Sequence, residues 1–228
     1  MTTPGLTAVL CPQPPLLFRE LGGLADPVAA LRAACLATLR DTLAAGPDVV
    51  VVAGAADGPV DPGGRPDVRR WGTTGERTGP GLPLALGVGR RLLDDAGWTG
   101  PTELVGLDVD ADGADLRELA AALAARPGRV LLLLLGEGSA RRDPKGPGTL
   151  DERAFPYDGR LLTALRDGDA HALATLDPTL ARDLMVLGRA SLRLLGEVGL
   201  RADGPPAAAV AYADDPFGVM YVVATWRW

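Results

Sequence analysis

The chain has 228 residues, of which 47% are hydrophobic and only 4% aromatic, and its formal net charge is −6. This length and apolar content suit one domain spanning residues 1–228, with a core of leucine, valine and alanine. The negative charge argues against nucleic acid as a partner, because nucleic-acid-binding surfaces need clustered positive charge.

The first half of the chain alternates strand-like and helix-like segments. Residues 6–10 predict a buried strand, and residues 48–54 predict a second one that is apolar on both faces and therefore central. Between them, Asp26 is expected to cap a helix with Pro27 at its first position, and this helix ends at residues 46–47.

The middle of the chain continues the same pattern. Residues 55–81 are rich in glycine, proline and charge, which predicts a long surface loop. A helix over 82–96, a short strand over 104–107 and a helix over 115–125 follow. Residues 130–135 then form the most apolar predicted strand of the chain.

A second long loop, 136–157, leads into a helical region and two closing strands. The predicted helices cover 161–166, 171–176 and, with breaks, 180–198, and the predicted strands cover 207–213 and 219–226. The whole pattern is typical of an α/β domain with a central, mostly parallel or mixed sheet flanked by helices. Because ligands of open α/β sheets bind at the carboxyl ends of strands, we expect the functional site among the loops there.

The start of the chain, its longest apolar run and its cysteines indicate where in the cell the protein is expected. No basic segment followed by an apolar run opens the chain, and residues 130–135 are too few to cross a bilayer. We therefore expect a cytoplasmic protein with no membrane partner, in which Cys11 and Cys35 are free thiols. Lys145 is the only lysine in a chain rich in alanine, glycine and proline, which indicates a GC-rich genome such as that of an actinobacterium.

Four segments carry a resemblance to a known family. They are CPQPPLL at 11–17, DVVVVAGAADG at 48–58, LLLLLGEGSA at 131–140 and VAYADDPFGVMYVVATW at 210–226. In their order and spacing they are similar to the class III extradiol ring-cleavage dioxygenases, subunit-B-like. The resemblance implies that family's fold over nearly the whole chain. It also implies an Fe(II) cofactor held by two histidines and a carboxylate, with a further histidine as catalytic acid and base.

The positions that the resemblance implies for histidines hold other residues. Gln13 stands at the first ligand position, the second falls among residues 54–57, and the acid/base position falls at Ala140. His171 is the only histidine in the chain, so two imidazoles from one chain cannot hold Fe(II). We therefore expect no catalytic residue of the family, no metal site and no cofactor, and we interpret His171 as a solvent-facing residue near a helix start.

What remains is a predicted pocket at the strand ends. Its candidate residues are Gln13, Asp57, Glu137, Ser139, Asp214 and Asp215. The favoured function is a non-catalytic family member that binds a small molecule or a partner there. The alternative is a metal-dependent enzyme, ring-cleaving or hydrolytic, in which Gln13 and the carboxylates hold a hard cation such as Mg²⁺. Asp214 and Asp215 also fit a plain hairpin turn, which is the interpretation we favour for them.

Other residues near these strand ends have two interpretations each. The glycines of segment 136–139 permit an anion cradle of backbone N–H groups, but a plain turn is favoured. Arg141 and Arg142 fit a ligand carboxylate or, as the favoured interpretation, a solvated loop. Cys11 is better explained as a small buried side chain than as a reactive thiol.

The C-terminal aromatic residues suggest an interaction. Tyr221, Trp226 and Trp228 lie on or just beyond the last predicted strand, and aromatic side chains are common in interfaces. If that strand is an edge strand, it is expected to join a homo-oligomer. A third hypothesis is therefore an assembly protein, and packing of these aromatics in the core is the alternative.

Overall fold

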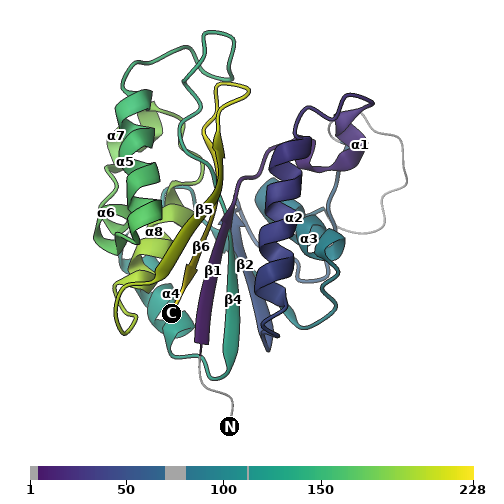
Figure 1. The fold of residues 1–228 in the computed structure, drawn as a ribbon, viewed down its shortest axis with the longest axis vertical. Coiled ribbons are helices and arrows are strands. Elements are labelled where there is room, and N and C mark those ends of the chain that lie inside the picture. Colours follow the sequence, from purple (N-terminus) through teal and green to yellow (C-terminus); the bar gives the residue numbers. More distant parts are fainter. Residues whose placement is uncertain (1–4, 70–80, 112) are drawn as a thin grey trace.

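A six-stranded mixed sheet organises the chain (Figure 1), and the computed structural model describes residues 5–69, 81–111 and 113–228 of it. The strands are β1 (Gly5–Cys11), β2 (Val49–Ala55), β3 (Thr102–Leu107), β4 (Arg129–Leu135), β5 (Ala207–Asp214) and β6 (Tyr221–Arg227). Their order is β3-β2-β4-β1-β6-β5. The first four are mutually parallel, whereas β6 runs antiparallel to both β1 and β5. The predicted α/β fold is confirmed.

Helices cover both faces of the sheet (Figure 1). They are α1 (Arg19–Gly22), α2 (Ala29–Leu43), α3 (Leu84–Ala96), α4 (Gly113–Ala124), α5 (Ala154–Asp167), α6 (Ala170–Ala174), α7 (Pro178–Asp183) and α8 (Arg189–Gly199). A short 3₁₀ helix, Pro15–Leu17, follows β1. Helices α2 and α3 pack on one face, and α4 to α8 pack on the other. None of the helices in the described ranges is long and apolar enough to cross a membrane.

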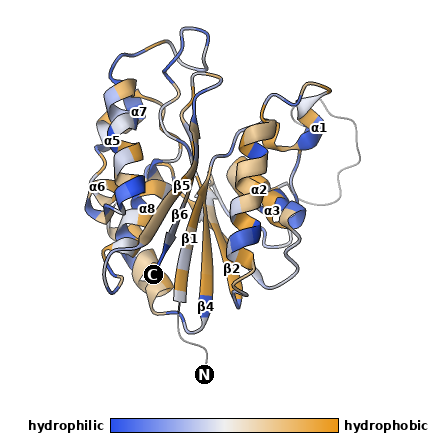
Figure 2. Cartoon of the chain, in the orientation of Figure 1, coloured by the Kyte–Doolittle hydropathy of each residue, from blue (hydrophilic) through white to orange (hydrophobic). Residues whose placement is uncertain are grey.

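The two cores explain why the central strands are apolar without alternation. In β4, Leu131, Leu133 and Leu135 face the α2–α3 core, while Leu132 and Leu134 face the other core. A strand covered by helices on both faces needs apolar residues at every position. Figure 2 shows the same continuous hydropathy along β2 and β4, which pair with each other in the middle of the sheet.

Most predicted strands and helices are found within a few residues of their expected limits. The helix predicted over 161–166 is an exception, because α5 already begins at Ala154, inside the predicted loop 136–157. The breaks expected within 180–198 fall at residues 184–188, between α7 and α8. The predicted loop 55–81 includes a segment, 70–80, that lies outside the described residues.

The predicted start of the first long helix is wrong. Helix α2 begins at Ala29, and its cap residue Val28 offers no side-chain hydrogen bond. Asp26 instead pairs with the guanidinium of Arg32, which is almost fully buried and also donates to the carbonyl oxygen of Leu16. An unpaired charge on the buried Arg32 would destabilise the fold far more than a helix start without a side-chain cap. Asp26 therefore pairs with Arg32 and does not cap the helix.

The prediction that the last strand is an edge strand is also wrong. Strand β6 lies between β1 and β5, so its hydrogen-bonding groups are occupied on both sides. Trp226 is fully buried, with its indole N–H donating to Leu165 at 2.9 Å, and Tyr221 is buried too. Both are core side chains, and Trp226 has Trp228 packed edge-on against it at 5.9 Å between ring centroids. The edge strands are β5 next to β6 and β3 at the other side of the sheet, and a homo-oligomer stays a prediction.

Candidate functional site

A cavity of about 390 Å³ lies at the carboxyl ends of the parallel strands. Gln13 from the end of β1 and Asp57 from the end of β2 supply polar groups. Val109, Leu84 and Leu187 supply apolar surface from the segment after β3, the start of α3 and the segment between α7 and α8. This is the edge of the sheet at which the sequence predicted a site.

Gln13 joins the ends of β1 and β4. Its backbone N–H donates to Oε2 of Glu137 at 2.9 Å, and its side-chain Nε2 lies 3.4 Å from Oε1 of the same carboxylate. The side chain is buried, with 5% of its surface exposed. Its remaining polar atom, Oε1, is also buried and has no hydrogen-bond partner among the described residues. The amide oxygen is therefore left without a partner beside the cavity that Gln13 lines.

Glu137 is an unusual carboxylate because it is buried with only an amide beside it. Burial raises the pKa of Glu137 to about 7, and the two hydrogen bonds from Gln13 offset only part of that rise. Tyr221, from β6, lies close enough for the charge of Glu137 to contribute to its raised pKa, although burial is the larger cause. Glu137 can therefore exchange a proton near neutral pH.

Two glycines make room for Glu137 at the end of β4. A Cβ atom on Gly188 would lie 2.5 Å from the backbone nitrogen of Glu137, and one on Gly136 would lie 2.8 Å from the Cα of Gly188. The segment between α7 and α8 can therefore pack directly on the strand end. In the same segment Met185 has a φ of 56°, a left-handed conformation that is rare for residues other than glycine.

This segment was not predicted as part of the site, and no local pattern in the sequence marks it. It brings Leu187, with 54% of its surface exposed, into the lining of the cavity together with Val109. The same two residues line a second cavity of about 290 Å³ with Met185, Arg182 and Arg189. The two cavities therefore share these two apolar side chains.

Ser139 and Asp215 belong to a different group of side chains. The backbone N–H and the hydroxyl of Ser139 donate to the buried carboxylate of Asp158, at 2.9 and 2.5 Å. Arg142 bridges Asp158 and Asp215, at 3.2 and 2.5 Å, and its guanidinium lies 4.7 Å from the ring centre of Phe155. This network fixes the long loop after β4 to the β5–β6 turn.

The six candidate residues therefore do not form one pocket. Gln13 and Asp57 line the cavity, and Glu137 contacts it through Gln13. Asp214 ends β5 as an exposed residue, and the turn that follows is closed by a hydrogen bond from Gly218 to the carbonyl of Asp215, as the hairpin interpretation predicts. Among the residues that the structure describes, no group of three or more acidic, histidine or cysteine side chains is placed to hold a metal ion.

The anion cradle predicted as an alternative for segment 136–139 is not formed. The N–H groups of Gly136 and Gly138 donate to backbone carbonyls of Cys11 and Met220, both at 2.9 Å, and that of Ser139 donates to Asp158. With these donors occupied, the plain-turn interpretation is confirmed.

The arginines after this turn are not simply solvated. Arg141 donates to the carbonyls of Thr149 and Asp183, both at 2.9 Å, and Arg142 is held by its two carboxylates. The favoured interpretation of a solvated loop is therefore wrong for these two residues. Asp158 is the buried acceptor here and needs the cation of Arg142, whereas the two carbonyls that Arg141 binds are exposed.

Cys11, Cys35 and His171 are placed as predicted. Both cysteines are buried free thiols, and a hydrogen bond with Cys35 together with burial raises the pKa of Cys11. His171 is an exposed residue at the start of α6, away from the strand ends.

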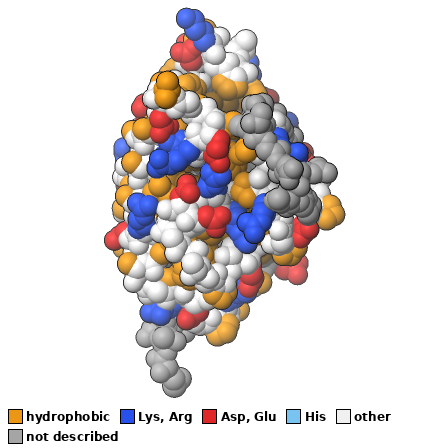
Figure 3. All heavy atoms as spheres, turned by 90° about the vertical axis from the view of Figure 1, so that its right-hand side faces the viewer, with side chains coloured by type: hydrophobic (Ala, Val, Ile, Leu, Met, Phe, Trp, Pro, Cys, Tyr) orange, Lys and Arg blue, Asp and Glu red, His pale blue; other side chains and the backbone are white. Residues whose placement is uncertain are grey.

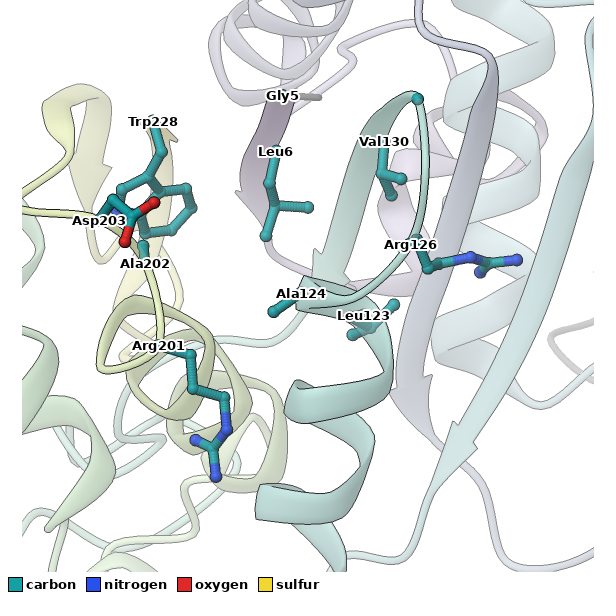
Figure 4. A pocket seen from close by; sticks show the side chains of 11 residues that line it. Gly5, Leu6, Leu123, Ala124, Arg126, Val130, Arg201, Ala202, Asp203 and Trp228 are labelled. Atoms are coloured by element: carbon teal, nitrogen blue, oxygen red, sulfur yellow. The ribbon is translucent and has the colours of Figure 1, made fainter. Parts of the chain in front are cut away.

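A further cavity, of about 240 Å³, lies at the opposite edge of the sheet (Figure 4). Leu6 and Val130 form its apolar centre, while Arg126 and Arg201 extend away from each other at its margin (Figure 4). Arg126 is paired with Glu103 and Arg201 with Glu197. These two arginines are therefore neutralised locally and do not converge on a ligand.

The face covered by α2 and α3 has basic and acidic side chains interspersed (Figure 3). One such pair joins Arg91 of α3 to Glu20 of α1 at 2.5 Å. The view in Figure 3 shows no large area of one charge on this face.

Comparisons with known proteins identify the fold only. No family model and no curated protein matches the sequence. The crystal structure of the uncharacterized protein JW3007 from Escherichia coli K12 is similar, with a TM-score of 0.51 over 96% of this chain and 98% of that one. The two sequences are 15% identical, so the similarity concerns the arrangement of the sheet and its helices.

Proposed function

We propose that this protein is a divergent relative of the class III extradiol dioxygenases that binds a small molecule at the carboxyl edge of its sheet and does not cleave rings. The observation that carries the proposal is a cavity of about 390 Å³ at the strand ends whose lining includes Gln13, a buried side chain with an unpaired Oε1. A buried acceptor without a partner is unfavourable by about 1–3 kcal/mol, and a bound donor would remove that penalty.

The size and lining of the cavity support a small, mostly apolar ligand. Its volume falls in the usual range for small-molecule sites, which is about 300–1,000 Å³. Ala55, Leu84, Val109 and Leu187 contribute apolar surface, and Gln13 contributes a fixed polar group. This combination of an apolar wall with a few oriented polar groups is typical of sites that bind and orient a small organic molecule.

The residues at the family's reactive positions support the loss of ring cleavage. Gln13 uses its amide to pair with Glu137, and Ala140, at the acid/base position, is buried and cannot transfer a proton. The one histidine of the chain, His171, is on α6. A site with two imidazole ligands therefore cannot be assembled within one chain.

Binding can be tested with two ring compounds that differ in one group. Phenol carries a hydroxyl donor, and fluorobenzene is a similar ring without one. In NMR titrations we expect phenol to shift the signals of the Gln13 side-chain amide and the Leu187 methyl groups, and to bind more tightly than fluorobenzene.

Two variants complete the test. Gln13→Leu is expected to remove the preference for phenol, while Leu24→Asp, at an exposed residue outside the cavity, should leave it unchanged. If neither compound shifts signals of the residues that line the cavity, the proposed function is wrong.

A second function, an enzyme that uses Glu137, is favoured by one observation. A carboxylic acid with a pKa of about 7 suits general acid and base catalysis at neutral pH. Loading the protein anaerobically with Fe(II), Mn(II) and Zn(II) tests the metal-dependent form of this hypothesis. A tight one-to-one metal that is lost on Glu137→Gln would favour the enzyme, whereas equal binding by wild type and variant would count against it.

A further inference from the structure

We propose that the second cavity, the one of about 290 Å³, binds a small organic carboxylate with an apolar body. Two arginines of its lining would hold the carboxylate, and its exposed apolar side chains would cover the rest of the ligand. This inference goes beyond the proposed function, because it concerns another cavity and another class of ligand.

Arg189 carries a charge that the surrounding protein neutralises only in part. Its side chain is 7% exposed, and its Nη2 donates to the backbone carbonyl of Val109 at 2.7 Å. The carboxylate of Asp110 lies 3.7 Å from the same nitrogen, which is too long for a hydrogen bond. Burial, and the nearby charges of Arg193 and Arg182, lower the pKa of Arg189. A buried cation in such surroundings is stabilised by an added anion.

The guanidinium of Arg189 also has donors left for a ligand. Among the described residues, its Nε and Nη1 have no hydrogen-bond partner, and neither is one of the fully enclosed polar atoms without a partner. Both atoms can therefore be reached from the cavity or from solvent, in contrast to the amide oxygen of Gln13. A carboxylate that accepts from Arg189 would make a charge-assisted hydrogen bond, which is stronger than a neutral one.

The lining of the cavity has an excess of positive charge. Arg182 and Arg189 share one carboxylate, that of Asp110, and Arg182 donates to it at 3.0 Å. The side chains of Arg182 and Asp110 are 65% and 67% exposed, so this ion pair is weak. A ligand carboxylate can therefore compete with Asp110 for both arginines and would balance the remaining charge.

The apolar part of the lining is exposed to an uncommon degree. Val109, Met185 and Leu187 are 37%, 38% and 54% exposed, and they are three of the eight exposed large hydrophobic residues in the described part of the chain. Exposed apolar residues that gather at one hollow mark a binding surface, whereas single ones do not. Met185 is also held at a φ of 56°, and such unfavourable backbone conformations are concentrated at ligand sites. Apolar walls beside a cation favour an anion with an apolar body.

Benzoate tests the proposal against two matched compounds. Benzyl alcohol keeps the ring without the charge, and acetate keeps the carboxylate without the ring. Binding is followed by methyl NMR at pH 7.5, since Met185 lines the second cavity only and Ala85 lines only the cavity of about 390 Å³. We expect benzoate to shift the Met185 signal and to bind at least about tenfold more tightly than either control.

Three variants identify the residues that hold the carboxylate. Asp110→Asn removes the competing carboxylate and should tighten benzoate binding about three- to fivefold, whereas Arg182→Gln should weaken it by a similar factor. Both positions are exposed, so both variants should fold. Arg166→Gln is the matched control, because it removes a charge from an exposed residue at the end of α5, outside the cavity lining, and should leave the affinity unchanged.

The outcomes separate this inference from the proposed function. The inference is wrong if benzoate shifts Ala85 but not Met185, or binds no more tightly than the two control compounds. It is also wrong if Asp110→Asn and Arg182→Gln change the affinity no more than Arg166→Gln does. None of these measurements depends on Gln13 or on phenol, so either proposal can fail while the other stands.

Discussion

Glu137 should make the protein less stable as the pH rises, and the size of this effect follows from its pKa. A rise from 4.5 to about 7 corresponds to roughly 3 kcal/mol, because one pKa unit is about 1.4 kcal/mol. Between these two values the folded protein holds a proton that the unfolded chain has released. Raising the pH through this window therefore removes stability, and above pH 7 the full penalty is present.

Glu137→Gln tests this directly, since it keeps the shape of the side chain and removes its charge. The variant should be more stable than the wild type by roughly 3 kcal/mol at pH 8.5 and by about 1–2 kcal/mol at pH 5.5. At about 2–4 °C per kcal/mol for a chain of this size, the higher pH corresponds to a rise in Tm of roughly 6–12 °C.

Urea denaturation of both proteins across this pH range measures the difference. Taking the difference between variant and wild type cancels the titration of all other groups. Glu118→Gln, at an exposed glutamate of α4, is the matched control and should change stability by no more than about 0.5 kcal/mol at any pH. A stability difference for Glu137→Gln that is the same at pH 5.5 and 8.5 would refute the reasoning.

Three further predictions concern the packing around the site and are measured by denaturation at pH 7. Trp226→Ala should lose about 3–5 kcal/mol, because the fully buried ring leaves a cavity; a loss below 1 kcal/mol would contradict its place in the core. Gly188→Ala should destabilise by at least 1–3 kcal/mol, since its Cβ would lie 2.5 Å from the nitrogen of Glu137. Arg142→Met should lose about 3 kcal/mol by leaving Asp158 buried without its cation, and less at a pH low enough to protonate Asp158.

The fold could be predicted because its strongest signals are local. The uninterrupted apolar residues of β2 and β4 require burial on both faces, and a central position in a helix-covered sheet is the arrangement that provides it. The start of α2 was predicted wrongly because it depends on a tertiary contact, which no local sequence pattern shows. The partner of Asp26 is the buried Arg32, and a helix-cap pattern contains no information on which side chains end up buried.

The site was predicted only in part, because some of its residues are brought there by contacts between segments far apart in the sequence. Gln13 and Glu137 follow apolar strands, so the rule for parallel sheets placed both at the same edge. Gly188 and Leu187 are different. Their role arises from packing against residues about 50 positions earlier, and neither a lone glycine nor an exposed leucine in a helical region signals such a contact. Asp158, the buried partner of Ser139, was likewise hidden inside a helix.

The pairing of Gln13 with Glu137 is better explained by function than by stability. Well-packed apolar side chains of similar volume usually stabilise a buried position as well as or better than a polar pair. Here the pair leaves one amide oxygen without a partner and holds a carboxylate whose ionisation is unfavourable at neutral pH. Folded domains retain only about 5–15 kcal/mol of stability, so a penalty of roughly 3 kcal/mol is a large fraction of it. Local features that are unfavourable for folding are concentrated at functional sites. Under the proposed function, a ligand that completes the hydrogen bonding of Gln13 would recover part of the penalty and so stabilise the folded protein.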